Sequence, residues 1–599
     1  MKDYQAPLED MRFVLRELVD LDAILALDSE SAITPDLVDA VLIEAAKFAS
    51  GVLAPTDHAG QTVGMRWQDG AVISPEGYRE AYVQFVEAGW NSLSCRSEFG
   101  GQAFPRTISA MVEEMWRSSN LAFTGCMTLT RGAIEAIEQR GDEHLKRTYL
   151  PRLIRGDWTG SMNLTEPQAG SDLSAIRARA EPQADGSYRL FGQKIFISWG
   201  RHDLAENVVH LVLARTPNAP EGVKGISLFL VPQQLPDSGG NPGIRNDIHC
   251  AAIEKKLGQH GAPACVMLYG AGEYPVDGKA GAIGQLVGEL NRGLEIMFIM
   301  MNEARFGVGL EGLAGSERVL QTARAYARDR VQGSELGGER GVKVPIIRHP
   351  DVRRMLLRMK SATEGMRALG AAIAAALDRI HACADEDART FVDLMTPIYK
   401  GWNTEAAVEL ASMGIQIHGG MGFMDECLAS QHWRDSRIMP IYEGTTAIQA
   451  NDLVGRKIAR DGGAAARGLA AQIRETAKRL ESQGGLDSLS RALSNAADAI
   501  EASAAWIVAN WGPKPSSVLG VAVPVLQLFW LGAIGWQLGR SAIAARRLLN
   551  EDTDDRAFLE TKINTAVFFA EHWMPAIEGL ITEVQNGSDS LLELADECF

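Results

Sequence analysis

The sequence predicts a multidomain α protein with a central β-domain. Apolar residues recur at helical spacing toward both ends of the chain, whereas segments rich in β-branched and aromatic residues lie between them. At 599 residues the chain is too long for a single hydrophobic core, so several domains are expected. We place an N-terminal helical domain at 1–158, a middle β-domain at 159–287, a helical bundle at 288–462 and an additional helical domain at 463–599.

The N-terminal domain begins with a strong helix signal. Residues 36–46 carry apolar side chains at helical spacing, and Thr34 and Pro35 before them supply a cap and a first-turn proline. A further short helix is expected to start at residue 142. Pro151 is expected to interrupt it, because proline lacks the N–H group that a helix interior requires.

The middle domain is distinguished by residues typical of strands. Residues 188–198 partly alternate between apolar and polar side chains, which indicates a strand with one buried face. The short apolar runs 208–214 and 226–231 lie between proline and glycine turns and are typical of buried strands. Residues 236–246 hold several glycines and prolines among polar residues and are expected to form an inserted loop.

The helical period returns at about residue 288 and continues toward the C-terminus. The glycine pair 462–463 marks an expected hinge before the additional helical domain. Within that domain, residues 518–538 resemble a membrane span, but Pro524 and Gln527 interrupt a stretch whose length is marginal for crossing a bilayer. A helix buried in a bundle is therefore favoured.

Composition disfavours several classes of partner and site. The formal net charge of −17 argues against DNA, RNA or anionic lipid as the main partner. The seven cysteines are widely spread and include no C-x-x-C pair, so neither a disulfide framework nor a metal site is expected. The N-terminus lacks a basic region followed by an apolar run, so no secretion signal is expected and a cytoplasmic location fits.

The strongest candidate for chemistry lies in residues 441–449. Glu443 is followed directly by a glycine, and Thr445 or Thr446 is a plausible N-cap for a helix that starts there. A carboxylate held on a turn, rather than on a solvated helix face, is placed to abstract a proton inside a pocket. Taken alone, however, the same pattern fits a surface glutamate in a turn.

Two further stretches support a functional role for Glu443. Residues 162–172, at the start of the β-domain, combine small residues, hydroxyls and a glycine, which allow backbone N–H groups to approach a phosphate or the edge of a ring. Residues 416–423 form a glycine cluster that ends a helix. Taken singly, the first fits an ordinary polar loop equally well, and the second fits an ordinary helix end.

In this order and at these separations, the three stretches resemble the acyl-CoA dehydrogenase family over about residues 35–460. Supporting pieces are the run 145–156, the tripeptide 192–194 and Arg305. The inserted segment and the long C-terminal extension resemble the long bacterial subgroup, which includes the 3-methylmercaptopropionyl-CoA dehydrogenases. The resemblance implies a helical domain, a β-barrel-like middle domain and a four-helix C-terminal bundle that bind FAD, with a further helical domain appended.

The resemblance also assigns site residues by motif match. It implies FAD contacts at Met162, Leu164, Thr165, Gly170, Ser171, Phe196, Ile197, Ser198, Arg330, Gln416, Gly419, Gly420, Thr445 and Ala447. It implies substrate contacts at Ser171, Asn302, Arg305 and Glu443. The sequence departs from the family pattern at Phe196 and Ser198, where the family has Trp and Thr. It also departs at Gly333, where the family has a phenylalanine three residues after the FAD-contacting arginine.

By the same resemblance, Glu443 is the base that takes the α-proton of a short-chain acyl-CoA, such as 3-methylmercaptopropionyl-CoA. The β-hydrogen leaves as hydride to the flavin N5, which yields a 2,3-enoyl-CoA. Some members carry the base directly before the helix arginine, but that position is Ala304 here, and Glu303 lies one residue earlier, about 100° away around a helix.

Several alternatives stay open at this point. The same residues also fit a medium- or long-chain acyl-CoA dehydrogenase or an acyl-CoA oxidase. For a dehydrogenase, electron-transfer flavoprotein is the expected electron acceptor. A DNA-associated flavoprotein fits poorly, because residues 461–599 hold 11 basic against 18 acidic residues. A homodimer or a dimer of dimers is expected, with Trp506, Trp511 and residues 518–538 as candidate contacts between subunits.

Overall fold

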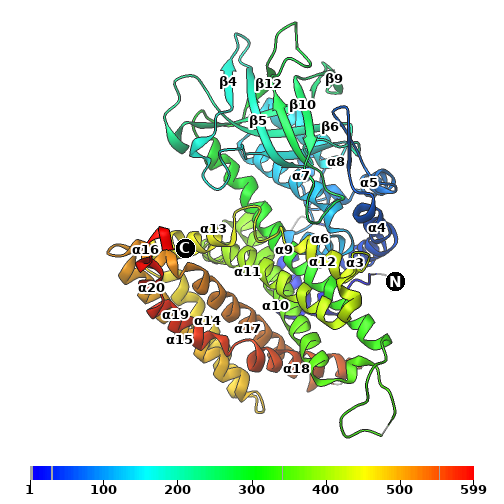
Figure 1. Ribbon diagram of the computed structural model, residues 1–599, viewed down its shortest axis with the longest axis vertical. Coiled ribbons are helices and arrows are strands. Elements are labelled where there is room, and N and C mark those ends of the chain that lie inside the picture. The colour runs from blue at the N-terminus through cyan, green and yellow to red at the C-terminus, as the bar shows by residue number, and fades with distance from the viewer. Residues whose placement is uncertain (1–3, 29–30, 340, 552–553, 599) are drawn as a thin grey trace. The chain divides into compact units, whose positions relative to one another are not determined.

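The computed structural model describes residues 4–28, 31–339, 341–551 and 554–598 and divides into two compact units (Figure 1). The first unit comprises residues 1–46, 105–118 and 308–599, and the second comprises 47–104 and 119–307. Both units are discontinuous in sequence, and helix α9 (Gly293–Asp329) contributes residues to each. The multidomain α fold with a central β-domain is confirmed.

The second unit is built on an eight-stranded sheet. Its strands are β3 (Trp158–Asn163), β4 (Arg179–Pro182), β5 (Tyr188–Ser198), β6 (Asn207–Arg215), β7 (Ile226–Pro232), β10 (Ile248–Ile253), β11 (Ala264–Tyr269) and β12 (Ala282–Leu286). The strand order is β10-β11-β5-β12-β7-β6-β3, and β4 pairs with both β5 and β6. Strands β4, β5, β12, β7 and β6 therefore close on themselves, as expected for a β-barrel-like domain.

The expected strands are confirmed, and their burial explains their composition. Every residue of β7 is buried, and all but the last residue of β6 are buried. Such strands have two covered faces and consequently read as continuous apolar runs rather than as alternating patterns. Strand β5 alternates more because part of it is exposed.

The prediction of an inserted loop at 236–246 is wrong in part. Residues 236–246 contribute to a two-stranded antiparallel hairpin made by β8 (Gln234–Pro236) and β9 (Pro242–Arg245). The backbone of Asp237 and Gly240 forms the turn, and the Asp237 carboxylate accepts hydrogen bonds from the N–H groups of Gly239 and Asn241. Turn-forming residues in a short segment are equally compatible with a hairpin, because the same residues form the tight turn between two strands.

The second unit also contains helices and a two-stranded hairpin. These elements are α4 (Ala54–Thr62), the hairpin β1 (Arg66–Gln68) and β2 (Ala71–Ile73), α5 (Tyr78–Glu87), α7 (Leu121–Arg140) and α8 (Glu143–Arg155). Helices α7 and α8 pack against β3. One hydrophobic core joins α7, α8, strands β3, β6 and β7, and the start of α9. Pro151 does not interrupt α8, because the helix buries Leu150, Leu153 and Ile154 around it and ends only at Gly156, whose φ is +93°.

The first unit is helical. Its elements are α1 (Leu8–Phe13), α2 (Leu21–Leu25), α3 (Pro35–Phe48), α6 (Arg106–Ser119), α9, α10 (Pro350–Cys383), α11 (Glu386–His418), α12 (Leu428–Ser436), α13 (Thr446–Asn451), α14 (Ala464–Glu481), α15 (Asp487–Trp511), α16 (Pro515–Gly520), α17 (Ala522–Leu549), α18 (Arg556–His572), α19 (Ala576–Asn586) and α20 (Ser588–Glu593). The expected cap of α3 is confirmed, since Thr34 Oγ1 accepts from Leu37 N at 3.2 Å. Gly462 and Gly463 both adopt positive φ in the turn before α14.

Helix α17 is the apolar centre of the additional C-terminal helices. It packs against α10, α11, α14, α15, α18 and α19 (Figure 1). Within the described residues it is the one helix long and apolar enough to cross a membrane, yet most of it is buried inside the unit. The expectation of a buried helix is thus confirmed. The expected subunit contact at 518–538 is wrong for most of this stretch, since side chains such as Leu526, Phe529 and Trp530 are covered within the same unit.

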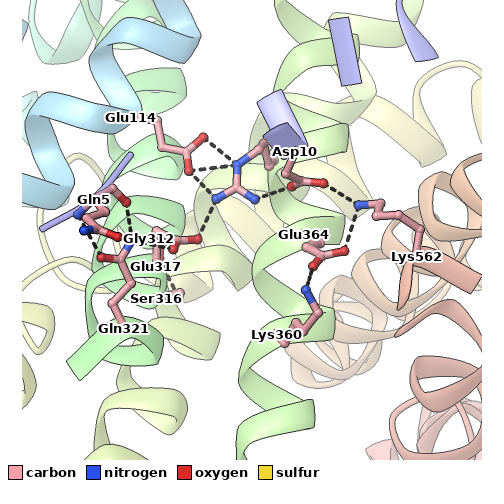
Figure 2. Close-up of polar contacts among 11 residues, drawn as sticks. Gln5, Asp10, Glu114, Gly312, Ser316, Glu317, Gln321, Lys360, Glu364 and Lys562 are labelled. Atoms are coloured by element: carbon pink, nitrogen blue, oxygen red, sulfur yellow. Dashed lines mark hydrogen bonds and ion pairs between the residues drawn. The ribbon is translucent and has the colours of Figure 1, made fainter. Parts of the chain in front are cut away.

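A buried guanidinium joins segments of the first unit that are far apart in sequence (Figure 2). Arg367 on α10 donates to Glu114 on α6 at 2.6 and 3.0 Å, to Glu317 on α9 at 2.7 Å, and to Asp10 on α1. All four side chains are buried. Because a buried charge is tolerated only with partners, this arrangement fixes the three carboxylate-bearing helices around α10.

The network extends into the additional C-terminal helices. Lys562 on α18 donates to Asp10 and, at 2.7 Å, to Glu364 on α10, which also binds Lys360 (Figure 2). Asp10 therefore bridges Arg367 and Lys562. The appended helices are tied to the N-terminal segment by charge as well as by apolar packing.

The network contains one carboxylate whose proton affinity is unusual. Burial raises the pKa of Glu114 to about 7, despite the favourable charge of Arg367. The folded protein therefore binds this proton more tightly than the unfolded chain, whose glutamates titrate near their ordinary value. Stability from this group is present at low pH and is lost as pH rises from about 4.5 to about 7.

Replacing Glu114 with glutamine should abolish this loss, because the amide stays neutral throughout. The difference in unfolding free energy between Glu114→Gln and the wild type should rise with pH between 5 and 7, by about 1.4 kcal/mol per pH unit at its steepest. Urea unfolding of both proteins at a series of pH values measures this difference. A flat difference across the interval would contradict the shifted proton affinity.

Candidate active site

In the second unit, a buried lysine fastens the loop that follows β3 to strand β5. Lys194 Nζ donates to the Leu164 carbonyl at 2.9 Å and to Glu166 Oε1 at 2.8 Å. Ile195 N donates to the Thr165 carbonyl at 2.9 Å. The structure thus brings Leu164 and Thr165 beside the strand that carries Phe196, Ile197 and Ser198.

Glu166 holds the rest of the loop through its carboxylate. Its oxygens accept from Gln168 Nε2 and from the N–H groups of Arg177 and Ala178, at 2.7 to 3.0 Å. Burial opposes its ionisation, but Lys194 and these N–H groups lower the pKa of Glu166, whereas burial lowers the pKa of Lys194 to about 8. Both groups are therefore charged at neutral pH, and the loop is closed by an ion pair.

Strand β5 presents an exposed aromatic ring on a strained backbone. Phe196 has a φ of +57° and its side chain is 60% exposed, whereas the neighbouring Ile197 is buried. Trp199, with a φ of +55°, is buried. Bulky residues rarely adopt positive φ, and such strain persists where the surroundings impose it, commonly at ligand sites. An exposed ring held this way is a suitable surface for a planar ligand.

The remaining predicted residues of the second unit lie on the loop after Ala169, on α9 and in β3. Gly170 and Ser171 are exposed on the loop beyond the Glu166–Ala169 bridge. On α9, Asn302 is exposed, whereas Arg305 is buried, with its guanidinium 5.7 Å from the Phe298 ring centre. Met162, in β3, is partly buried against the hydrophobic core.

In the first unit, Glu443 lies on the turn before α13, as predicted. Its φ is +53°, and Gly444 follows with a φ of +87°. Thr445 is the N-cap, its hydroxyl accepting from Ile448 N at 3.3 Å. Two consecutive left-handed residues therefore precede the helix, and the glutamate carries strain of roughly 1 kcal/mol or more.

The carbonyls of this turn are held by buried donors. Lys400 Nζ, on α11, donates to the Gly444 carbonyl at 2.6 Å. Gln449 Nε2 donates to the Glu443 carbonyl at 3.1 Å and to the Gly444 carbonyl at 3.4 Å. Lys400 and Gln449 are both fully buried. A side chain at position 444 would come within 2.8 Å of Gln449 Nε2, so the clamp also requires glycine there.

Tyr442, the residue before Glu443, is tied to a chain of charges. The Tyr442 hydroxyl donates to Glu311, which accepts from Arg117 at 3.1 Å, and Arg117 also donates to Glu113 at 2.8 Å. Burial raises the pKa of Glu311 despite the nearby positive charges of Arg117 and Lys400. Burial also opposes ionisation of Glu113, but Arg106 and Arg117 lower its pKa to about 2.

Other predicted cofactor residues of the first unit are accessible. Gln416, near the end of α11, and the following Gly419 and Gly420 are exposed, and neither glycine has an atom within 4 Å of where a side chain would begin. Arg330 is exposed just beyond α9. Such open backbone is suited to close approach by a ligand.

Sequence reasoning missed the residues that support these stretches. Lys194, Lys400 and Gln449 were not predicted as site residues, although each binds the backbone of a predicted stretch. A signal was present for Lys400, which is a lone charge directly after the buried residues Ile398 and Tyr399. Among the residues that the structure describes, no cluster of His, Cys, Asp and Glu is arranged to hold a metal ion.

Comparison with known proteins decides the family. The 3-methylmercaptopropionyl-CoA dehydrogenase of Ruegeria pomeroyi is 46% identical over 98% of this chain and 99% of its own length. The chain belongs to the acyl-CoA dehydrogenase family. Models of the acyl-CoA dehydrogenase N-terminal, middle and C-terminal domains match residues 44–157, 161–269 and 291–458, and a model described as acetyl-CoA dehydrogenase C-terminal like matches 469–595.

Other relatives agree with this assignment. A butyryl-CoA dehydrogenase of Syntrophomonas wolfei is 32% identical over 100% of this chain and 99% of its own length. The crystal structure of Caenorhabditis elegans ACDH-11 in complex with C11-CoA shares the fold with a TM-score of 0.75 at 20% identity, covering 96% of this chain and 92% of that one. An acyl-CoA dehydrogenase from Bacillus anthracis complexed with FAD has a TM-score of 0.72 at 19% identity, with coverages of 94% and 90%.

This acyl-CoA dehydrogenase is an FAD-dependent oxidoreductase that dehydrogenates acyl-CoA thioesters. The residues present fit the cofactor. In the second unit, Phe196 offers an exposed ring and Thr165 lies on the fastened loop beside the same strand. In the first unit, Gly419 and Gly420 leave open backbone for a ligand.

Replacing Lys194 with methionine should weaken FAD binding, because the loop at 164–166 would lose the donor that fastens it. An additional ordering cost of about 1.4 kcal/mol would weaken binding tenfold, and ordering one residue costs about this much. Flavin released on dilution measures the effect. Lys256→Met is the matched control, since the Lys256 ammonium binds the Ala262 carbonyl in the same unit instead. Equal FAD retention by both variants would contradict the role.

Proposed function

We propose that this acyl-CoA dehydrogenase acts on short-chain acyl-CoA thioesters, with 3-methylmercaptopropionyl-CoA as the preferred substrate and Glu443 as the base. The base assignment rests on the strained, clamped backbone at Glu443, a residue that matches the family motif. The substrate assignment is supported by the 46% identity over nearly the whole chain to the Ruegeria pomeroyi enzyme of that name.

In the proposed reaction, the Glu443 carboxylate takes the α-proton of the bound thioester. A thioester α-proton is weakly acidic, so its removal requires hydrogen bonds to the thioester oxygen that strengthen as negative charge develops. By family resemblance, the Glu443 N–H supplies one of these donors. FAD, when bound, accepts the two electrons and the β-hydrogen.

The remaining site assignments belong to the same proposal. Thr165, Phe196 and Ser198 hold the flavin, and Gln416, Gly419 and Gly420 hold the rest of FAD. Asn302, Arg305 and Ser171 line the thioester site. The consecutive domains 1–158, 159–287, 288–462 and 463–599 are likewise proposed as the functional divisions of the chain.

We propose electron-transfer flavoprotein as the electron acceptor and a homodimer, or a dimer of dimers, as the assembly. Both proposals rest on the family resemblance. A cytoplasmic location is supported by seven cysteines without a disulfide and by the burial of the apolar helix α17 inside its unit.

Glu443→Gln should bind FAD normally but lose flavin reduction by acyl-CoA. Loss of a general base typically costs about 10²- to 10⁴-fold in rate. Anaerobic stopped-flow absorbance at saturating acyl-CoA measures this rate. Glu303→Gln is the matched control, since Glu303 lies near the position where other members carry their base, and it should reduce at the wild-type rate. Rapid bleaching of the flavin in Glu443→Gln would refute the assignment.

The substrate proposal predicts the order of a thioester panel. The specificity constant should be highest for 3-methylmercaptopropionyl-CoA, lower for butyryl-CoA and lower again for octanoyl- and palmitoyl-CoA. Each methylene that a pocket fails to accommodate changes specificity by about 10- to 200-fold. A maximum at octanoyl-CoA or longer would overturn the short-chain assignment. Stoichiometric hydrogen peroxide under air would instead identify an oxidase.

A further inference from the structure

We infer that Lys400 is a positioning residue for the base: its ammonium fixes the left-handed turn at Glu443 and brings a positive charge to the residue that follows it. This inference rests on the proposed role of Glu443. It assigns a function to a residue outside the 441–449 stretch, 43 positions from Glu443 in the sequence and on another helix, α11.

Lys400 Nζ lies 2.6 Å from the carbonyl oxygen of Gly444, the residue directly after the base. A charge-assisted hydrogen bond of this length is among the stronger ones in proteins. It sets the orientation of the peptide group between Gly444 and Thr445, while Gln449 sets that of the preceding peptide at 3.1 Å.

The left-handed turn at Glu443 depends on neighbouring groups to keep its conformation. Glutamate at a φ of +53° is less stable than in the right-handed or extended regions by roughly 1–3 kcal/mol, so the surroundings must impose the conformation. Without the clamp, the turn can relax to an ordinary conformation and the side chain of Glu443 then points elsewhere. A displacement of about 1 Å is enough to reduce a rate about 10²-fold.

Lys400 is fully buried, and desolvating an ammonium is costly unless the protein uses its charge. The adjoining Gly401 lies against Leu526 of α17 and against Gln449, since a side chain there would be 2.6 and 3.1 Å from them. Helix α17 therefore covers α11 at the position next to the lysine.

The burial gives the charge a role beyond the hydrogen bond. In a poorly solvated position a cation favours the ionised form of a neighbouring carboxylate. Lys400 already acts in this way on Glu311, whose carboxylate binds Tyr442 next to the base. Other charged groups around this turn are Arg117, which binds Glu311, and Glu405, which binds Thr446.

The test compares Lys400→Met with Lys562→Met. Both variants remove a fully buried ammonium and keep the length of the side chain, but Lys562 binds Asp10 and Glu364 and does not touch the turn. Both should lower the melting temperature. Lys400→Met alone should slow anaerobic flavin reduction by about 10²-fold, with FAD content and acyl-CoA affinity kept, and should move the acid limb of the rate–pH profile to higher pH.

A readout independent of turnover is hydrogen exchange of the peptide 440–452. Exchange there should become faster in Lys400→Met and stay at the wild-type rate in Lys562→Met. Lys400→Gln keeps an amide donor without charge and is the second variant if the methionine variant does not fold. It should show the same shift of the pH profile with a smaller loss of rate.

The outcomes distinguish failure of the Lys400 inference from failure of the base assignment to Glu443. If Lys400→Met is folded, holds FAD and reduces at the wild-type rate with an unchanged pH profile, the inference about Lys400 is overturned. Equal slowing in Lys562→Met also overturns it, because general destabilisation then explains the effect. If Glu443→Gln itself reduces normally, the base assignment fails, and the Lys400 inference fails with it for that separate reason.

Discussion

The hydrogen bond from the Lys400 ammonium to the Gly444 carbonyl is the constraint on which the proposed chemistry depends. A base must present its carboxylate in one direction, and a turn of two consecutive left-handed residues is not a conformation that glutamate adopts by preference. The surrounding helices supply the missing preference. Gln449 lies in the same stretch as Glu443, but Lys400 comes from α11, so the turn is held by a tertiary contact as well as by its own residues.

The same solution appears in the second unit. There a buried lysine, Lys194, binds the Leu164 carbonyl in the loop that carries Thr165. In each unit an ammonium from a neighbouring element binds the backbone of a stretch proposed to form part of the site, and this contact holds an irregular backbone in place. The two sites differ in how the charge is compensated: Lys194 pairs with Glu166, whereas Lys400 lies near Glu311 and beneath the additional C-terminal helices.

The additional helices have a structural role that follows from these contacts. Trp530 of α17 donates to Asn403 of α11 at 2.8 Å, and Asn403 donates to the Gly309 carbonyl of α9 at 3.1 Å. Asn403 lies three residues, or about one helical turn, from Lys400. The appended helices thus brace the helix that carries the clamp, while Lys562 ties them to the N-terminal segment through Asp10.

The fold class, most strands and helices, and the three stretches that carry the family pattern could all be predicted from the sequence alone. These are local signals: the apolar period of residues 36–46, the β-formers of 188–198 and the turn chemistry at Glu443 and Thr445 are readable without distant partners. The sequence failed at Pro151, where burial on both sides of the proline outweighs the lost hydrogen bond, and at 236–246, where turn residues closed a hairpin. The contacts of Lys194 and Lys400 with the proposed site stretches, and the joining of three helices by Arg367, emerge only from the folded chain. These contacts link residues 30, 44 and up to 357 positions apart, and no local pattern encodes which distant carbonyl or carboxylate a buried cation will meet.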